Sequence, residues 1–177
     1  MPKLLIATVL LVTSYQLLVT PPTFARTTPQ DIIDTQLESY NSKLQTYSPQ
    51  SKLKLETASG RISDLNKKIT SDWEANCLRQ GEILEEYIRR FEIEEKKLTD
   101  GKTRNLSNEV ENARYWLTYA HEAAAYQAAN KYIFNLTSEN NINSDINSKI
   151  NQMSGDLNIL RGKVLKSQKI IENLVSS

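Results

Sequence analysis

Apolar residues recur along most of the chain at alternating spacings of three and four residues, which is the period of an amphipathic α-helix. The first such run is Asp31–Tyr47, and the Ser48-Pro49 pair after it favours the start of another helix. Its apolar positions are Ile33, Leu37, Tyr40, Leu44 and Tyr47. All five prolines lie within the first 49 residues, so the strongest helix breaker is missing from the rest of the sequence. The pattern predicts an all-α fold.

The next predicted helix is Pro49–Leu98, and Asp100-Gly101 is expected to end it, with glycine at the left-handed C-cap position. Its apolar positions are Leu55, Ala58, Ile62, Leu65, Ile69, Trp73, Cys77, Leu84, Tyr87, Phe91 and Leu98. The Ser59-Gly60 pair is a possible break in this helix. In that case a short helical piece would precede one long helix. The opposite face carries acid–base pairs spaced four apart, typical of a solvated surface: Glu85/Arg89, Glu86/Arg90 and Glu92/Lys96.

Glu109–Phe134 is a long, aromatic and weakly charged segment, and Ser107 or Asn108 is expected to cap its helix. One apolar row comprises Leu106, Val110, Ala113, Leu117, Ala120 and Ala124, and a second comprises Trp116, Tyr119, Ala123, Tyr126 and Ile133. The rows lie about 110° apart around the helix, so together they would contact two neighbouring helices. This segment is therefore predicted to be the central packing helix.

The last predicted helix, Ile142–Val175, follows a polar turn at Ser138–Asn141. Its apolar positions are Ile146, Ile150, Met153, Leu157, Leu160, Val164, Ile171 and Leu174, with Ser167 as the one polar lapse. Because short connections make successive helices antiparallel, the prediction is an elongated antiparallel bundle of three long helices. Asp31–Tyr47 adds a shorter N-terminal helix, and the regular spacing indicates coiled-coil character.

Residues 1–25 have the pattern of a signal peptide: Lys3, then an apolar stretch over Leu4–Leu18, then Pro21-Pro22 and a small residue at Ala25. An uncleaved membrane anchor is the alternative, although polar residues interrupt the apolar stretch and leave it shorter than the ~20 residues of a spanning helix. Residues 26–30 are predicted to be a polar linker, and 31–177 one helical domain. The protein is expected to be exported to the cell envelope or secreted.

The charge is balanced, with 22 Lys+Arg and 21 Asp+Glu in 177 residues. Without the leader, whose one charged side chain is Lys3, acidic and basic residues are equal in number. Such a chain has no field that would attract nucleic acid or an anionic membrane. Membrane attachment is expected only if the leader is retained as an anchor.

The residues that usually carry catalysis are sparse. His121 begins a partial zinc-protease motif, but Ala125 stands where the second histidine is required, and Thr118 stands where a di-iron Glu-x-x-His motif needs its glutamate. Haem ligation by His121 and Met153 is not expected, because the two residues would lie about 6–8 Å apart along the bundle axis. That offset is too large for both side chains to bind one iron. Cys77, the one cysteine, is predicted to be buried, with an intermolecular disulfide as the alternative. No catalytic, metal-binding or cofactor-binding residue is predicted.

The aromatic residues are the best candidates for ligand or partner contacts: Tyr115, Trp116, Tyr119, Tyr126 and Tyr132. Aromatic residues at helical spacing usually belong to a core, so Trp116, Tyr119 and Tyr126 are predicted to pack inside the bundle. Tyr115 and Tyr132 lie off the two apolar rows and are predicted to be exposed, where they would meet a partner.

Two functions fit these observations. The first is a non-enzymatic exported protein that acts as a structural or interaction module, binding a protein partner or itself. The second is a bundle that binds a small apolar or amphipathic ligand between its helices, next to Trp116, Tyr119 and Tyr126.

Overall fold

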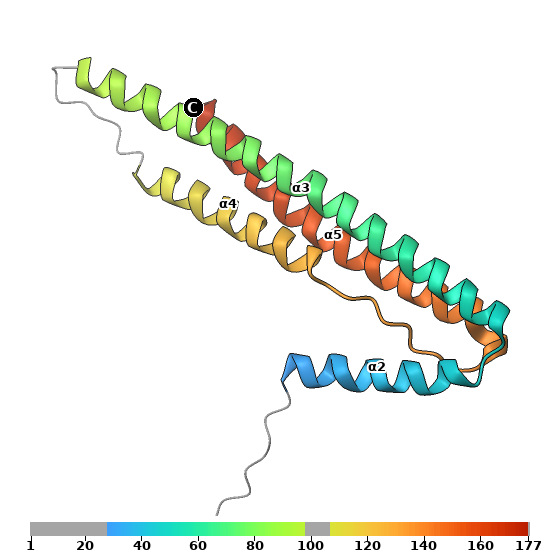
Figure 1. Cartoon of the computed structure of the whole chain (residues 1–177). Helices are drawn as coiled ribbons and strands as arrows, with labels where there is room; N and C mark the ends of the chain where they lie inside the picture. The colour runs from blue at the N-terminus through green and yellow to red at the C-terminus, as the bar shows by residue number, and fades with distance from the viewer. Residues whose placement is uncertain (1–27, 98–106, 177) are drawn as a thin grey trace, which may run out of the picture. The chain divides into compact units, whose positions relative to one another are not determined.

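The structure is a computed structural model and describes residues 28–97 and 107–176. Its elements, labelled as in Figure 1, are α2 (Pro29–Gln45), α3 (Pro49–Lys97), α4 (Ser107–Ala128), the 3-10 helix η1 (Glu139–Asn141) and α5 (Ile142–Val175). No strand occurs in the described ranges, which confirms the all-α prediction for them. The predicted signal peptide and the predicted helix end at Asp100-Gly101 lie outside these ranges. None of the described helices combines the length and apolar character needed to cross a bilayer.

The chain divides into two units, residues 1–35 and 36–177. In the described end of the first unit, α2 begins at Pro29 rather than at Asp31. The Asp31 amide donates to Thr28 Oγ1 at 3.2 Å, and the Thr28 amide donates to Asp31 Oδ2 at 2.6 Å. This reciprocal pair is a capping box, and its hydrogen bonds lower the pKa of the Asp31 carboxyl.

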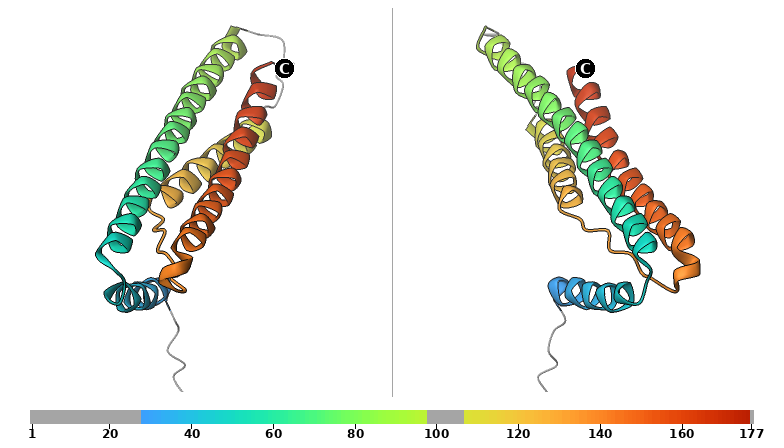
Figure 2. Two further views of the ribbon diagram at one scale, coloured as in Figure 1. Left: turned by 90° about the vertical axis from the view of Figure 1, so that its right-hand side faces the viewer. Right: turned by 45° about the vertical axis from the view of Figure 1, so that its right-hand side comes forward.

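Within the second unit, α3 and α5 run in the same direction and α4 runs opposite to both (Figures 1 and 2). Each of these three helices packs against the other two. The prediction that α4 would contact two neighbouring helices is confirmed, but α4 is not the central helix, because α3 and α5 also pack directly against each other and one core cluster contains no residue of α4. Helix α3 continues without a break through Ser59-Gly60, because Leu55 and Ile62 on either side are buried while Gly60 faces solvent.

The core consists of three clusters spaced along the bundle. The middle cluster contains Cys77, Ala120, Ala124, Leu160 and Val164, and the next contains Leu84, Ala113, Ile171 and Leu174. The third, near the start of α3, contains Tyr47, Leu55, Ile62, Tyr132, Phe134, Leu136, Ile142, Met153 and Leu157. In the first two clusters α4 contributes alanines, which let its backbone approach α3 and α5 closely.

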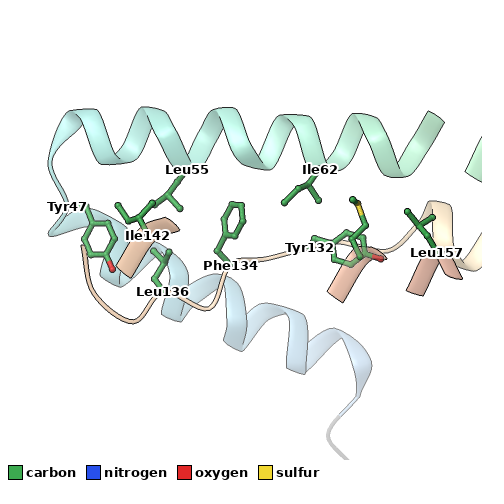
Figure 3. Close-up of a cluster of buried hydrophobic side chains, with 9 residues drawn as sticks. Tyr47, Leu55, Ile62, Tyr132, Phe134, Leu136, Ile142 and Leu157 are labelled. Carbon is green, nitrogen blue, oxygen red and sulfur yellow. The ribbon is translucent and has the colours of Figure 1, made fainter. Parts of the chain in front are cut away.

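Helix α4 ends at Ala128, six residues before the predicted end at Phe134. The chain then continues without helix to Ser138, and this extended segment is defined here as residues 129–138. Tyr132, Phe134 and Leu136 are buried, whereas the residues between them are exposed or half-buried. Figure 3 shows these three side chains directed into the core cluster beneath α3. A period of two is that of an extended chain, so the predicted helix over 129–134 is wrong.

The length of α3 explains the extended segment. Gln127 is hydrogen-bonded to Asn66, and Glu139 is hydrogen-bonded to Ser48. The 18 residues between Ser48 and Asn66 span about 27 Å of helix, whereas the 12 residues from Gln127 to Glu139 would span only about 18 Å as a helix. The returning chain can cover this distance only if part of it is extended.

Side chains of α2 and α5 satisfy backbone groups near the C-terminal end of the extended segment, and a side chain of η1 accepts a hydrogen bond from Ser48, next to the start of α3. Lys43 Nζ donates to the Leu136 carbonyl at 2.5 Å, and the Thr137 amide donates to Asp145 Oδ2 at 2.9 Å. The Ser48 amide donates to Glu139 Oε1 at 2.9 Å, and hydrogen bonds from Ser48 lower the pKa of Glu139. Tyr40 and Leu44 of α2 pack against the same core cluster. These contacts hold the C-terminal end of the segment in place.

The close approach of α4 gives the first prediction. Ala120→Leu and Ala124→Leu should each lower the free energy of unfolding by roughly 1–3 kcal/mol, because both alanines are buried against Leu160 and Val164. Ala125→Leu, at an exposed position on the same helix, is the matched control and should have little effect. Denaturant unfolding measures all three variants, and an unchanged midpoint for Ala120→Leu would contradict the close packing.

Candidate functional site

The most prominent surface feature is a group of aromatic rings on α4, formed by Tyr115, Trp116 and Tyr119 and called here the aromatic cluster. The Trp116 ring lies edge-on to both tyrosines, with centroids 5.6 Å from each. The Tyr115 and Tyr119 rings are stacked, with centroids 6.3 Å apart and planes at 4°. Rings in these arrangements attract one another, so the cluster is held in shape before any partner arrives.

The prediction that Trp116, Tyr119 and Tyr126 lie in the core is wrong for both tyrosines. Tyr119 is 38% exposed and Tyr126 is 79% exposed, while Tyr115 is 62% exposed and Trp116 is half-buried. The physical reason is that α4 buries its small side chains. When alanines form the contact, the gap between the backbones is too narrow for rings, which are left at the edges.

Two lysines of α5 reach over this cluster. Lys166 Nζ lies 3.5 Å from the centroid of the Trp116 ring, and Lys163 Nζ lies 4.5 Å from that of Tyr119. An ammonium group over a ring face is attracted by the negative potential of that face. The cluster is therefore an aromatic surface with positive charge at its border.

A groove of about 570 Å³ lies between α4 and α5, next to the aromatic cluster. It is called here the α4–α5 groove. Its lining is Tyr119, Glu122, Ala123, Tyr126, Gln127, Asn130, Gln152, Asp156, Ile159, Leu160 and Lys163. Two tyrosines thus share the groove with amide, carboxylate and ammonium groups, a lining that suits a ligand with both apolar faces and many polar groups.

A buried chain of hydrogen bonds lies beneath this groove, and sequence reasoning missed its members Asn66, Gln127 and Asp156. Gln127 Nε2 donates to Asn66 Oδ1 at 2.9 Å and to the Tyr132 hydroxyl at 2.5 Å. Asn66 Nδ2 donates to the Gln127 carbonyl at 2.9 Å, which satisfies an acceptor at the end of α4. The Tyr132 hydroxyl donates to Asp156 Oδ2 at 3.0 Å. The chain therefore joins α3, α4 and α5 at the point where α4 ends.

Tyr132 was predicted to be exposed, but it is 9% exposed and belongs to the core. The reason is that it lies on the extended segment rather than on α4. Burial raises the pKa of the Tyr132 phenol, so this group keeps its proton at neutral pH and acts as a donor to Asp156. The alternation of Tyr132, Phe134 and Leu136 was the sequence signal that could have revealed this position.

His121 and Cys77 occupy places that fit a structural role. His121 Nε2 lies 3.4 Å from Glu74 Oε1 on the surface between α3 and α4. Cys77 is buried in the middle cluster, and burial raises the pKa of its thiol. Within residues 28–97 and 107–176, no three histidine, cysteine, aspartate or glutamate side chains are grouped to hold a metal ion.

Two further hollows lie on α3. One, of about 260 Å³, is lined by Leu37, Tyr40, Ser59, Ile62, Ser63 and residues 130–134. The other is a more open groove of about 700 Å³ between α3 and α5, where Leu53, Leu65 and Ile150 are exposed. Leu65 and Ile150 were predicted to lie on buried stripes, but they are at the edges of the α3–α5 contact.

Comparison with protein-family models, with curated proteins and with solved structures gave no match. Inferences about function therefore depend on the surface and the grooves described above.

The buried hydrogen-bond chain gives the second prediction. Tyr132→Phe removes the hydroxyl that joins Gln127 to Asp156, and it should lower the free energy of unfolding by about 1–2 kcal/mol. Tyr126→Phe makes the same chemical change at an exposed ring and should leave stability unaltered. Thermal or denaturant unfolding distinguishes the two variants, and equal effects would show that the chain of hydrogen bonds contributes nothing.

Proposed function

We propose that this protein is an exported, non-enzymatic helical module that binds a protein partner through the aromatic cluster. The single observation that carries the proposal is the set of three rings in mutual contact, Tyr115, Trp116 and Tyr119, on the surface of α4 with Lys163 and Lys166 beside them. Tyrosine and tryptophan are the residue types that most often dominate binding energy at protein interfaces.

The geometry of the cluster favours tight contact at low entropic cost. Each ring already touches two others, so few rotamers are lost when a partner covers them. Large rigid rings also supply contact area with only two side-chain torsions each. Lys163 and Lys166 add positive charge at the border, which suits a partner surface that carries carboxylates.

The non-enzymatic part of the proposal is supported by the placement of the two side chains best suited to nucleophilic or acid–base chemistry. The Cys77 thiol lies in the core with a raised pKa, so it is neither accessible nor readily ionised. His121 lies on the surface beside Glu74, outside the α4–α5 groove. The export part is supported by the leader pattern of residues 1–25.

A second function, binding of a small apolar or amphipathic ligand, is favoured by the hollow of about 260 Å³ beside Tyr40 and Phe134. Its size fits a small molecule, and its lining joins aromatic and aliphatic side chains with Ser59 and Ser63. A rise in thermal midpoint with an apolar ligand, abolished by Phe134→Ala, would favour this function over the first.

The third prediction tests the proposed function by photo-crosslinking in the native host. A benzophenone amino acid replaces Tyr115 in the full chain, and a matched variant carries it at Leu78, which is 58% exposed on α3 and lies in none of the grooves described above. The Tyr115 position should give a discrete crosslinked species that the Leu78 position does not give. Adding Lys166→Ala should weaken that species, because Lys166 borders the same cluster.

Mass spectrometry of the crosslinked species tests the export part in the same experiment, since removal of residues 1–25 leaves a new N-terminus at Arg26. Identical crosslinks from the two positions, or none from the Tyr115 position, would contradict the proposed partner surface. An intact leader on a cytosolic protein would contradict export.

A further inference from the structure

We propose that the α4–α5 groove is a binding site for a β-1,4-linked polysaccharide chain, with Tyr126 and Tyr119 as its two stacking platforms. This inference goes beyond the proposed protein contact, because the groove extends from Tyr119 away from the aromatic cluster toward Asn130 and the end of α4. From the sequence, a small apolar or amphipathic ligand was expected next to Trp116, Tyr119 and Tyr126. For the α4–α5 groove, which Tyr119 and Tyr126 line, the proposed ligand is a sugar chain instead.

The spacing of the two rings is the first argument. Tyr119 and Tyr126 are seven residues apart, so they lie on the same side of α4 and about 10.5 Å apart along its axis. Alternate rings of a β-1,4-linked chain present the same face, and they recur at close to this distance. Two tyrosines two helical turns apart can therefore stack on every second sugar of such a chain.

The exposure of Tyr126 is the second argument. Its side chain is 79% exposed, and no ring contact to it occurs in the described part of the chain. A large exposed aromatic ring at the edge of a groove is an open platform. The C–H groups on one face of a pyranose ring are apolar and slightly positive, and they complement the negative face of an aromatic ring.

The polar side chains of the groove are the third argument. Gln152 and Asp156 from α5 line it together with Glu122, Gln127 and Asn130. Amide groups can both donate to and accept from sugar hydroxyls, and carboxylates accept two hydrogen bonds per oxygen. Asp156 is held in place by the Tyr132 hydroxyl at Oδ2, which leaves Oδ1 available to a ligand hydroxyl. An apolar ligand would leave these groups unsatisfied, whereas a sugar would not.

Lys163 determines which kind of glycan is preferred. Its Nζ lies over the Tyr119 ring at 4.5 Å and also lines the groove. A sugar that stacks on Tyr119 must displace this flexible, half-buried side chain, which can then pair with a carboxylate on the same sugar chain. The groove should accept neutral chains and bind chains that carry carboxylate groups more tightly.

The fourth prediction tests this site by measuring how much of the full-length protein is depleted from solution by insoluble polysaccharides. Chitin and cellulose represent neutral β-1,4-linked chains, insoluble carboxymethyl cellulose represents a carboxylate-bearing chain, and starch is the α-linked control. The protein should be retained by the β-1,4-linked materials and not by starch. Tyr126→Ala should weaken retention about tenfold, because one of the two stacking rings is lost.

Three variants make the result specific. Tyr126→Trp preserves a platform and should restore binding, whereas Leu78→Ala removes an exposed apolar side chain outside the groove and should leave retention unchanged. Lys163→Ala should remove the preference for carboxymethyl cellulose while leaving chitin binding in place. The thermal midpoint of Tyr126→Ala should match that of the wild type, because its side chain is exposed.

Retention by none of the β-1,4-linked materials would overturn the proposal, as would equal retention by starch. Equal losses in Leu78→Ala and Tyr126→Ala would also overturn it. Crosslinking from position 115 to a protein partner should persist in Tyr126→Ala, because Tyr126 lines the groove but lies outside the aromatic cluster. The polysaccharide site and the protein-binding function can therefore fail independently.

Discussion

The fold of this protein depends on a difference in length between helix α3 and the shorter stretch of chain that returns alongside it. Helix α3 is 49 residues long, and the chain that returns alongside it has 32 residues from the start of α4 to the end of the extended segment. At about 1.5 Å per residue, a helix of that length would stop well short of the beginning of α3. The chain resolves this by forming helix as far as Ala128 and continuing in an extended conformation. The hydrogen bonds of Asn66 and Gln127 mark the point of change.

The short length of α4 and its packing through small residues also determine the surface formed by α4 and α5. Because α4 is short and packs through Ala113, Ala120 and Ala124, its larger rings lie at the edges of the contact. The close backbone approach brings Lys163 and Lys166 of α5 over those rings. Where α4 ends, Tyr132 turns inward and positions Asp156 at the floor of the α4–α5 groove. Packing by small residues thus produces both the aromatic cluster and the polar groove next to it.

The helical regions could be predicted from the sequence because their apolar spacing is regular, and Pro49 and Ile142 start helices as expected. Two features could not be found in this way. Residues 126–134 contain enough apolar side chains to continue a helix. The chain is extended here because of the distance that it must cover, and buried side chains such as Tyr132 and Phe134 therefore occupy every second position. The exposure of Tyr119 and Tyr126 depends on which face α4 buries, and helical periodicity does not distinguish a face of alanines from a face of rings. The polar residues under the groove come from three helices, so no local motif joins them.

The most direct test of the extended segment is a distance measured by pulsed electron paramagnetic resonance between spin labels at Glu122 and Thr137, both exposed. Cys77 is buried, and its replacement by alanine removes any background labelling. With α4 ending at Ala128, the two Cα atoms should be about 30 Å apart, since five helical residues from Glu122 to Gln127 add about 8 Å to most of the roughly 27 Å between Gln127 and Glu139. A helix continuing through Phe134 and on to Thr137 would place them about 22 Å apart, and a distance near that value would contradict the account.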